Sequence, residues 1–209
     1  MTDGRDGAER RAAALWLRAF ERLAERAAHE IRNPLNGAVL NAEVVRARAA
    51  REGTVAASLA PFAEAAASEL ARAAALTEAM LALARPPRAP VDLEATLRPL
   101  VTLAAAVARA RGGDVELETP AAVSLGAAVD PHAARAAICL ALLGALDASG
   151  RARCGVSVVP EGVRVRIARD HGGAEGAEAV GEDALTILRE AGIGLESGPE
   201  GYTLLFPAR

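Results

Sequence analysis

The sequence predicts an α+β protein in which a long helical hairpin precedes a sandwich of helices packed on a sheet. Two observations predict this order. Apolar residues recur every three or four positions over the first 85 residues, and short alternating segments follow only after residue 90. A proline-rich stretch at 86–90 separates the two patterns, since proline ends helices. We therefore expect a hairpin domain at 1–85, a linker at 86–90 and a sandwich domain at 91–209.

The first helix is expected over residues 8–50, and the second over 62–83, after a break at 51–54. A lone hairpin buries each helix on one side and leaves an apolar stripe in water. We therefore expect two copies of the chain to form a homodimer with a four-helix bundle. The apolar positions of the first helix are Trp16, Phe20, Leu23, Ala27, Ile31, Leu35, Ala38, Ala42 and Val45.

The sandwich is predicted from capping and turn residues. Asp92 is a suitable N-cap for a helix that ends at 112–113, and Asp130-Pro131 opens another that ends at Gly150. Alternating residues at 115–118 predict a strand. The remaining expected elements are a hairpin over 156–167, a helix over 184–191 and two short strands that end at 202–206. Helices on one side of a mostly antiparallel sheet make an α/β sandwich.

Composition excludes several classes of partner. A net charge of −3 and an aromatic content of 2% favour no nucleic acid, because binding needs basic surface and stacking platforms. Charged residues interrupt every alanine-rich run, so we expect no membrane span. Residues 1–6 lack the order of a signal peptide, and we expect a cytoplasmic protein. Cys139 and Cys154 have no metal-site spacing and are expected to be buried.

The most informative segment is residues 29–35, with the sequence HEIRNPL. His29 lies two residues from the apolar seam on either side, about 200° of rotation, so its imidazole is expected in solvent. Asn33 at i+4 shares its face, and Glu30 beside it at the bundle shoulder can orient one ring nitrogen. Pro34 removes a helix hydrogen bond, so a bend is expected there.

Two other interpretations of this segment were weighed. The first is an ordinary solvent-exposed histidine on a charged helix. The second is a zinc-protease helix, which the sequence excludes because Asn33 stands where the second histidine ligand is required. A phosphoryl-accepting histidine explains the whole segment better, because a nucleophile needs exposure and an oriented ring.

Residues 29–35 resemble the H-box of bacterial sensor histidine kinases, and the flanking hairpin resembles their dimerisation and histidine-phosphotransfer domain. The order continues downstream. Asp130-Pro131 resembles the start of the N-box helix, residues 170–173 resemble a G1 box, and residues 192–207 resemble the closing hairpin of the ATP-binding domain. The resemblance implies a sandwich of the GHKL, histidine-kinase type.

The same resemblance implies that this sandwich is degenerate. Leu140 and Gly144 occupy the positions of the asparagines that hold Mg²⁺ in the family. Asp170 and Gly172 remain as a remnant, for which a plain turn is the alternative, but Ala174 replaces the last glycine. The segment from there to residue 184 is too short for a lid over ATP. We therefore expect no cofactor and no metal on this chain.

An acceptor bundle on a disabled kinase scaffold resembles the dimeric histidine phosphotransferases of phosphorelays. The resemblance implies that His29 relays phosphoryl groups between receiver-domain aspartates of response regulators without ATP, and that the receiver supplies Mg²⁺. Glu30 and Asn33 are the other expected catalytic residues. The expected docking residues are Arg26, Arg32, Asn36 and Leu40. The alternatives left open are a response-regulator phosphatase, a divergent ATP-dependent autokinase and a non-enzymatic dimeric scaffold that sequesters a regulator.

Overall fold

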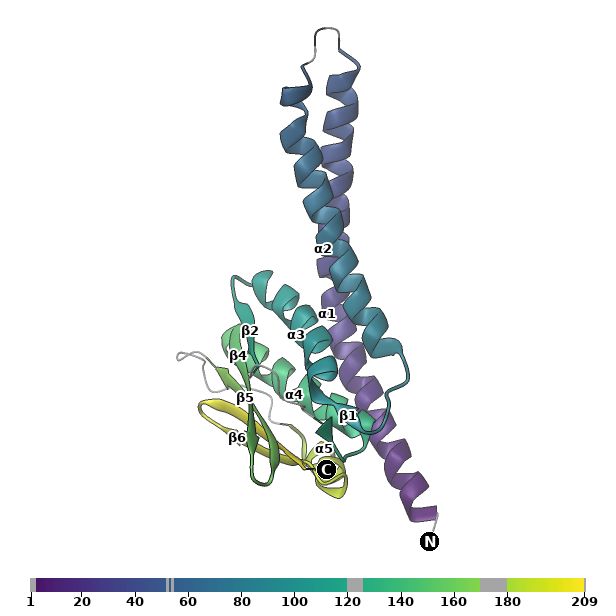
Figure 1. Cartoon of the computed structure of the whole chain (residues 1–209), viewed down its shortest axis with the longest axis vertical. Coiled ribbons are helices and arrows are strands. Elements are labelled where there is room, and N and C mark those ends of the chain that lie inside the picture. The colour runs from purple at the N-terminus through teal and green to yellow at the C-terminus, as the bar shows by residue number, and fades with distance from the viewer. Residues whose placement is uncertain (1–2, 52, 54, 120–125, 170–179, 209) are drawn as a thin grey trace.

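The computed structural model contains the predicted hairpin as two long antiparallel helices (Figure 1). It describes all residues except 1–2, 52, 54, 120–125, 170–179 and 209. Helix α1 spans Asp3–Ala49 and α2 spans Ala60–Ala84, with a 3₁₀ helix at Ala56–Ser58 between them. Helix α1 is continuous through Pro34. The part of the hairpin nearest its connecting loop projects beyond the rest of the molecule.

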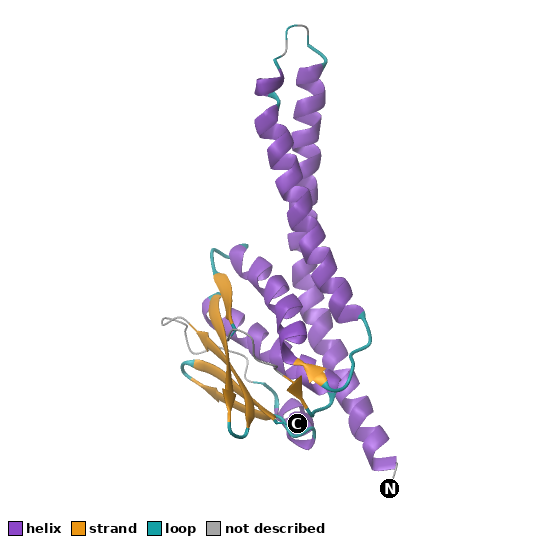
Figure 2. Ribbon diagram, in the orientation of Figure 1, coloured by secondary structure: helices purple, strands orange, loops and turns teal. Residues whose placement is uncertain are grey.

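The second half of the chain forms the predicted sandwich of helices on a sheet (Figure 2). The sheet has the order β2-β4-β5-β7-β6, with β2 parallel to β4 and every other pair antiparallel. A separate two-residue pairing joins β1 (Val91–Asp92) to β3 (Gly126–Ala127). The strands of the larger sheet are β2 (Asp114–Glu118), β4 (Arg151–Val159), β5 (Gly162–Arg169), β6 (Gly194–Gly198) and β7 (Gly201–Pro207).

Helices α3 (Leu93–Arg109) and α4 (Pro131–Ser149) begin at the predicted capping residues, and α4 also ends at its predicted glycine, whereas α3 ends at Arg109, before the expected 112–113. Helix α3 begins after Asp92, whose carboxylate accepts a hydrogen bond from the Ala95 N–H at 3.0 Å. Helix α4 begins after Asp130, which accepts from the Ala133 N–H at 2.8 Å. It ends at Gly150, whose φ of 68° is left-handed and suits glycine. Helix α5 spans Glu182–Glu190. These caps confirm the expected boundaries because they satisfy helix N–H groups locally.

Helix α4 lies between the sheet and the hairpin, in contact with β4, β5, β7 and α1. Its window Pro131–Ala148, with a hydropathy of 1.2, is long and apolar enough to cross a membrane by length and composition alone. Burial within the fold accounts for 67% of that window. A core helix of this kind passes the same test, because it too is covered by apolar neighbours on several sides.

Helices α1 and α4 run parallel where they pack. The Cys139 thiol donates to the Ala19 carbonyl at 3.4 Å, and farther along both helices Asp147 pairs with Arg26. Burial raises the pKa of the Cys139 thiol to about 12, which agrees with a small buried hydrophobe. The first half of α1 therefore belongs to the core of the sandwich as well as to the hairpin.

Arg135 of α4 joins three helices. Its Nη1 donates to the carbonyls of Leu83 and Arg85 at 3.0 Å and 2.8 Å, so it caps the end of α2. Its guanidinium also lies over the Trp16 ring of α1, 5.6 Å from the centroid. Desolvation lowers the pKa of Arg135 from its usual value. One side chain thus attaches the hairpin to the sandwich.

The buried face of α1 differs from the prediction after Ile31. Leu35 and Ala42 were expected in the seam, but both are exposed. Glu30 and Pro34 are buried instead, and Ala38 remains buried as expected. The reason is that this stretch carries apolar residues on two neighbouring faces, and periodicity alone does not show which one meets α2.

Candidate functional site

His29 is exposed on the middle of α1, as predicted. The His29 side chain points to solvent because Ala27, on the opposite side of the helix, is fully buried. Asn33 is also exposed, one turn farther along the same face. The structure therefore presents an imidazole and an amide together to solvent, which suits reaction with a group carried by another molecule.

Glu30 lies deeper than the sequence suggests. It was expected at the shoulder of the bundle, but only 7% of its surface is exposed, on the side of the helix that packs inward. Adjacent helical residues differ by about 100° in direction, so its carboxylate is placed on the buried side of His29. Any action of Glu30 on the imidazole must therefore come from the interior of the hairpin.

Three of the predicted docking residues share the exposed face of His29. Arg32, Asn36 and Leu40 are all exposed, and Leu40 retains 66% of its surface. Asn36 and Leu40 follow His29 at i+7 and i+11, within about 20° of its direction. Together with His29 they form a continuous strip that leads from the acceptor toward the loop of the hairpin.

Arg26, the fourth predicted docking residue, is engaged within the chain. Its guanidinium forms a two-point ion pair with Asp147 of α4, at 2.7 Å and 3.3 Å. Both side chains are largely covered, at 27% and 22% exposure. Sequence reasoning missed Asp147 because it lies far from Arg26 in the chain and no local pattern links the two.

The expected loss of the nucleotide site has a structural counterpart at Gly144. The Tyr202 ring occupies the space beside this glycine, and a Cβ added there would lie 2.3 Å from the tyrosine Oη. An asparagine side chain therefore does not fit without displacing a buried ring. Leu140, the other asparagine position, packs against the hydrophobic core.

The cavity at this place is also small. It measures about 160 Å³ and is lined by residues that include Arg22, Leu140, Gly144 and Asp147. Ligand pockets usually measure about 300–1,000 Å³. Within the described ranges, no three His, Cys, Asp or Glu side chains are grouped to hold a metal ion. The remnant Asp170 and Gly172 lie outside the described residues.

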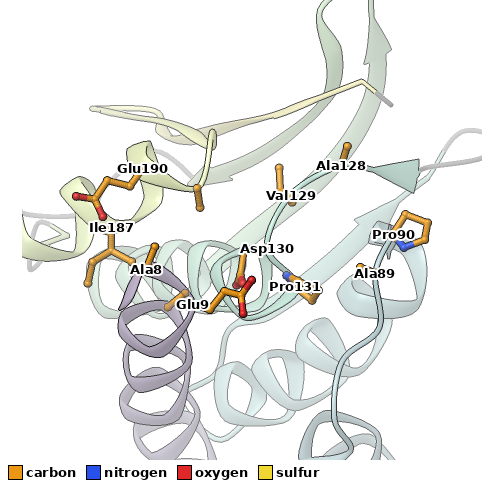
Figure 3. Close-up of a pocket in the computed structure, with 12 residues that line it drawn as sticks. Ala8, Glu9, Ala89, Pro90, Ala128, Val129, Asp130, Pro131, Ile187 and Glu190 are labelled. Atoms are coloured by element: carbon orange, nitrogen blue, oxygen red, sulfur yellow. The ribbon is translucent and has the colours of Figure 1, made fainter. Parts of the chain in front are cut away.

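A cavity of about 590 Å³ lies where the start of α1 meets α4, α5 and the linker (Figure 3). Its polar groups are the carboxylates of Glu9, Asp130 and Glu190, set among small apolar residues. Asp130 caps α4, and Glu190 pairs with Arg11 at 2.7 Å. The cavity is lined by residues 8–12 of α1, more than four helical turns from His29.

Comparison with known families places the site in a recognised domain. Residues 21–88 match the model of the His Kinase A (phospho-acceptor) domain. The matched segment contains His29, Glu30 and Asn33 with most of the hairpin. A search of curated proteins finds no match.

The solved structures that match the chain include one phosphotransferase and two histidine kinases. One is described as a bacterial phosphotransferase, with 14% identity, a TM-score of 0.44, and coverage of 90% of this chain and 95% of that one. The Acinetobacter baumannii histidine kinase AdeS has 14% identity and a TM-score of 0.44, and the match covers 87% of this chain and 98% of that one. Histidine kinase ThkA, solved in complex with response regulator protein TrrA, has 17% identity and a TM-score of 0.45. That match covers 92% of this chain and 63% of that one. We rest no argument on these likenesses, because all three scores lie below 0.5.

The family match and the geometry agree on the same helix. The match is to a phospho-acceptor domain, and His29 is exposed within the matched segment. That role places the chain in two-component signalling. Residues 21–88, which carry His29 on their exposed surface, are therefore the part of the chain that is similar to the His Kinase A (phospho-acceptor) domain.

Proposed function

We propose that this protein is a histidine phosphotransferase, which takes a phosphoryl group from one receiver-domain aspartate onto His29 and passes it to another. The observation that carries the proposal is a contrast within one chain. His29 is exposed in the segment that matches a phospho-acceptor domain, whereas the Tyr202 ring and a cavity of about 160 Å³ lie at Gly144, a position that the resemblance assigns to the nucleotide site.

In the first half-reaction, the unprotonated ring nitrogen of His29 attacks the phosphorus of an aspartyl phosphate in line. The N–P bond forms as the P–O bond to aspartate breaks, and the bonding electron pair leaves with the carboxylate. The other ring nitrogen keeps its proton, so no proton needs to move. The second half-reaction reverses these steps on a different receiver.

The residues around His29 are assigned supporting roles. Glu30, on the interior side of the helix, orients the imidazole and favours the charged ring that forms during transfer. Asn33, exposed at i+4, positions the phosphoryl oxygens. Mg²⁺ is supplied by the receiver, where it neutralises the transferring group, so this chain needs no metal ligands of its own.

The receiver is proposed to dock on the exposed strip formed by Arg32, Asn36 and Leu40. An apolar side chain flanked by an amide and a guanidinium is a suitable small interface, because it combines burial with directional hydrogen bonds. Docking there brings the receiver's aspartate alongside His29, on the same face of α1.

The functional unit is proposed to be a homodimer. Among the described residues, no side chain of α1 beyond Ala38 and none of α2 before Ala73 is buried. Exposed apolar residues continue along both helices, as Leu35 and Val39 on α1 and Leu70 on α2. A hairpin end without a core is marginal in water, so a second copy that packs there would supply the missing burial.

The proposal is tested by offering the purified protein two phosphoryl donors. One is radiolabelled ATP with Mg²⁺, and the other is a panel of receiver domains charged with radiolabelled phosphate. We expect base-stable, acid-labile label from a receiver and none from ATP. Label from ATP alone would make the protein an autokinase, and the absence of label from both donors would favour a scaffold.

His29→Gln serves as the acceptor knockout, because glutamine keeps a polar side chain that cannot form a phosphohistidine. The matched control is His132→Gln, since His132 lies in the first turn of α4 beside the start of α1, about 24 Å along that helix from His29. We expect the first variant to lose all label and the second to keep it. Equal labelling of both variants would contradict the assignment of His29.

A response-regulator phosphatase is the second candidate, and the exposed Asn33 beside His29 favours it. In that function the amide aligns a water for attack on the aspartyl phosphate, and the histidine need not be phosphorylated. Loss of phosphate from a charged receiver, measured with the His29→Gln protein, separates the two. Hydrolysis that survives this substitution and is lost in Asn33→Ala would establish the phosphatase.

A further inference from the structure

One carboxylate near the acceptor is surrounded by three guanidinium groups. Asp147 of α4 lies 2.7 Å from Nη1 of Arg26, 3.7 Å from Nη1 of Arg111 and 4.0 Å from Nη2 of Arg22. We call these four residues the Asp147 cluster. Two of the arginines come from α1, and Arg111 comes from the turn after α3. The cluster therefore stands where the hairpin and the sandwich meet.

The two arginines of α1 also share the face of His29. Arg26 precedes it at i−3 and Arg22 at i−7, and residues at these spacings are neighbours on a helix surface. Residues at i and i+3 have Cβ atoms about 5–6 Å apart, which places His29 within reach of the flexible Arg26 side chain. Arg26 is thus a neighbour, on the helix surface, of the residue that is proposed to carry phosphate.

A phosphoryl group on His29 would be a second anion for which Arg26 could exchange Asp147. A phosphoryl group on the imidazole brings up to two negative charges and three acceptor oxygens, more than Asp147 offers. Arginine suits such a group because its planar fork binds two oxygens at once.

We propose that Asp147 is an exchangeable counter-ion for Arg26. It holds the guanidinium while His29 is unmodified, and it yields the guanidinium to the phosphoryl oxygens when His29 is phosphorylated. Arg26 is then the group that stabilises phosphohistidine, and Asp147 sets how readily it is released. This inference rests on the proposed phosphotransfer at His29 and adds to it a phosphoryl-binding residue and its regulator.

A purely structural ion pair is the competing explanation. The two explanations predict opposite changes in phosphoryl transfer when Asp147 is substituted. If the pair only holds the fold together, Arg26→Gln and Asp147→Asn impair transfer alike. If Asp147 competes for Arg26, its removal frees the guanidinium and improves transfer, whereas removal of Arg26 impairs it. The double variant should behave like Arg26→Gln, because nothing remains for Asp147 to release.

The experiment measures two quantities on the full-length protein. The first is the rate of phosphoryl transfer from a charged receiver to His29. The second is the lifetime of phosphohistidine after phosphorylation with phosphoramidate, which needs no receiver. We expect Arg26→Gln to lower both by about 10–100-fold, the range of a charge-assisted hydrogen bond. Asp147→Asn should raise both by about three- to tenfold, since the competing anion is gone.

The matched control is Glu190→Gln, which breaks the ion pair between Arg11 of α1 and α5. That pair has the same N–O distance of 2.7 Å and also joins α1 to the sandwich, but it lies about 27 Å along the helix from His29. Neither quantity should change in this variant. Arg26→Lys, which keeps the charge without the fork, should fall between wild type and Arg26→Gln.

The possible failures are separable. Losses of the same sign in Arg26→Gln and Asp147→Asn, with normal unfolding curves for both, would overturn the exchange and leave the phosphotransferase intact. Wild-type protein that accepts phosphoryl from phosphoramidate but from no receiver would overturn the proposed function. In that case a shorter phosphohistidine lifetime in Arg26→Gln and a longer one in Asp147→Asn would still support the exchange.

Discussion

At the scale of single residues, Gly144 decides what the middle of the sandwich can hold. We expect Gly144→Ala to lower the free energy of unfolding by about 1–3 kcal/mol, because the new methyl group meets the buried Tyr202 hydroxyl. Urea unfolding followed by circular dichroism measures the effect. The matched control is Gly155→Ala, where a Cβ meets nothing within 4 Å, and a change within about 1 kcal/mol is expected. Equal losses in both would contradict the steric explanation.

The residues of the candidate site were predictable only as far as local geometry reaches. The exposure of His29 and Asn33 follows from helical spacing, because the apolar seam at Ala27 lies opposite. The burial of Glu30 does not, since a carboxylate in a seam contradicts the usual preference of charged groups for water. The pairing of Arg26 with Asp147 depends on how α1 and α4 pack, which no local pattern contains.

At the scale of elements, Arg135 is a polar attachment between the end of the hairpin and the sandwich. We expect Arg135→Ala to cost about 2–3 kcal/mol of unfolding free energy, because two carbonyls of the α2 terminus lose a charged donor. The control is Arg98→Ala, which removes an exposed pair with Glu94 within α3 and should cost at most about 0.5 kcal/mol. Thermal unfolding of both variants measures the difference. Equal costs would contradict the role of Arg135 in attaching α2 to α4.

Element boundaries were predicted well wherever a capping residue marks them. The helices α3 and α4 begin where the side chains of Asp92 and Asp130 accept hydrogen bonds from helix N–H groups, and α4 ends at the left-handed Gly150. These boundaries are determined by local residues, so they can be predicted from the sequence. The seam of α1 after Ile31 was predicted less well. Two apolar faces compete there, and the choice depends on α2 and, in our proposal, on a second copy of the chain.

At the scale of the whole molecule, the exposed apolar residues of the hairpin predict self-association. We expect the protein to elute as a dimer at micromolar concentration and Val39→Asp to raise its dissociation constant at least about tenfold, because a charge then enters an apolar interface. Light scattering after size-exclusion chromatography measures the mass. Val158→Asp, at a comparably exposed valine of β4, should remain dimeric. A monomeric wild-type protein would contradict the proposed interface.

The continuity of α1 has a consequence for how the molecule tolerates changes in length. The helix packs on α4 through Ala19 and then carries His29 without a break, so it fixes both the height and the angular phase of the acceptor relative to the sandwich. One residue inserted between them would move His29 by about 1.5 Å and turn it by about 100°. Four inserted residues would nearly restore the phase while raising the imidazole by about one turn. The number of residues between Ala19 and His29 therefore sets both the position of the imidazole along the helix axis and the direction in which it points.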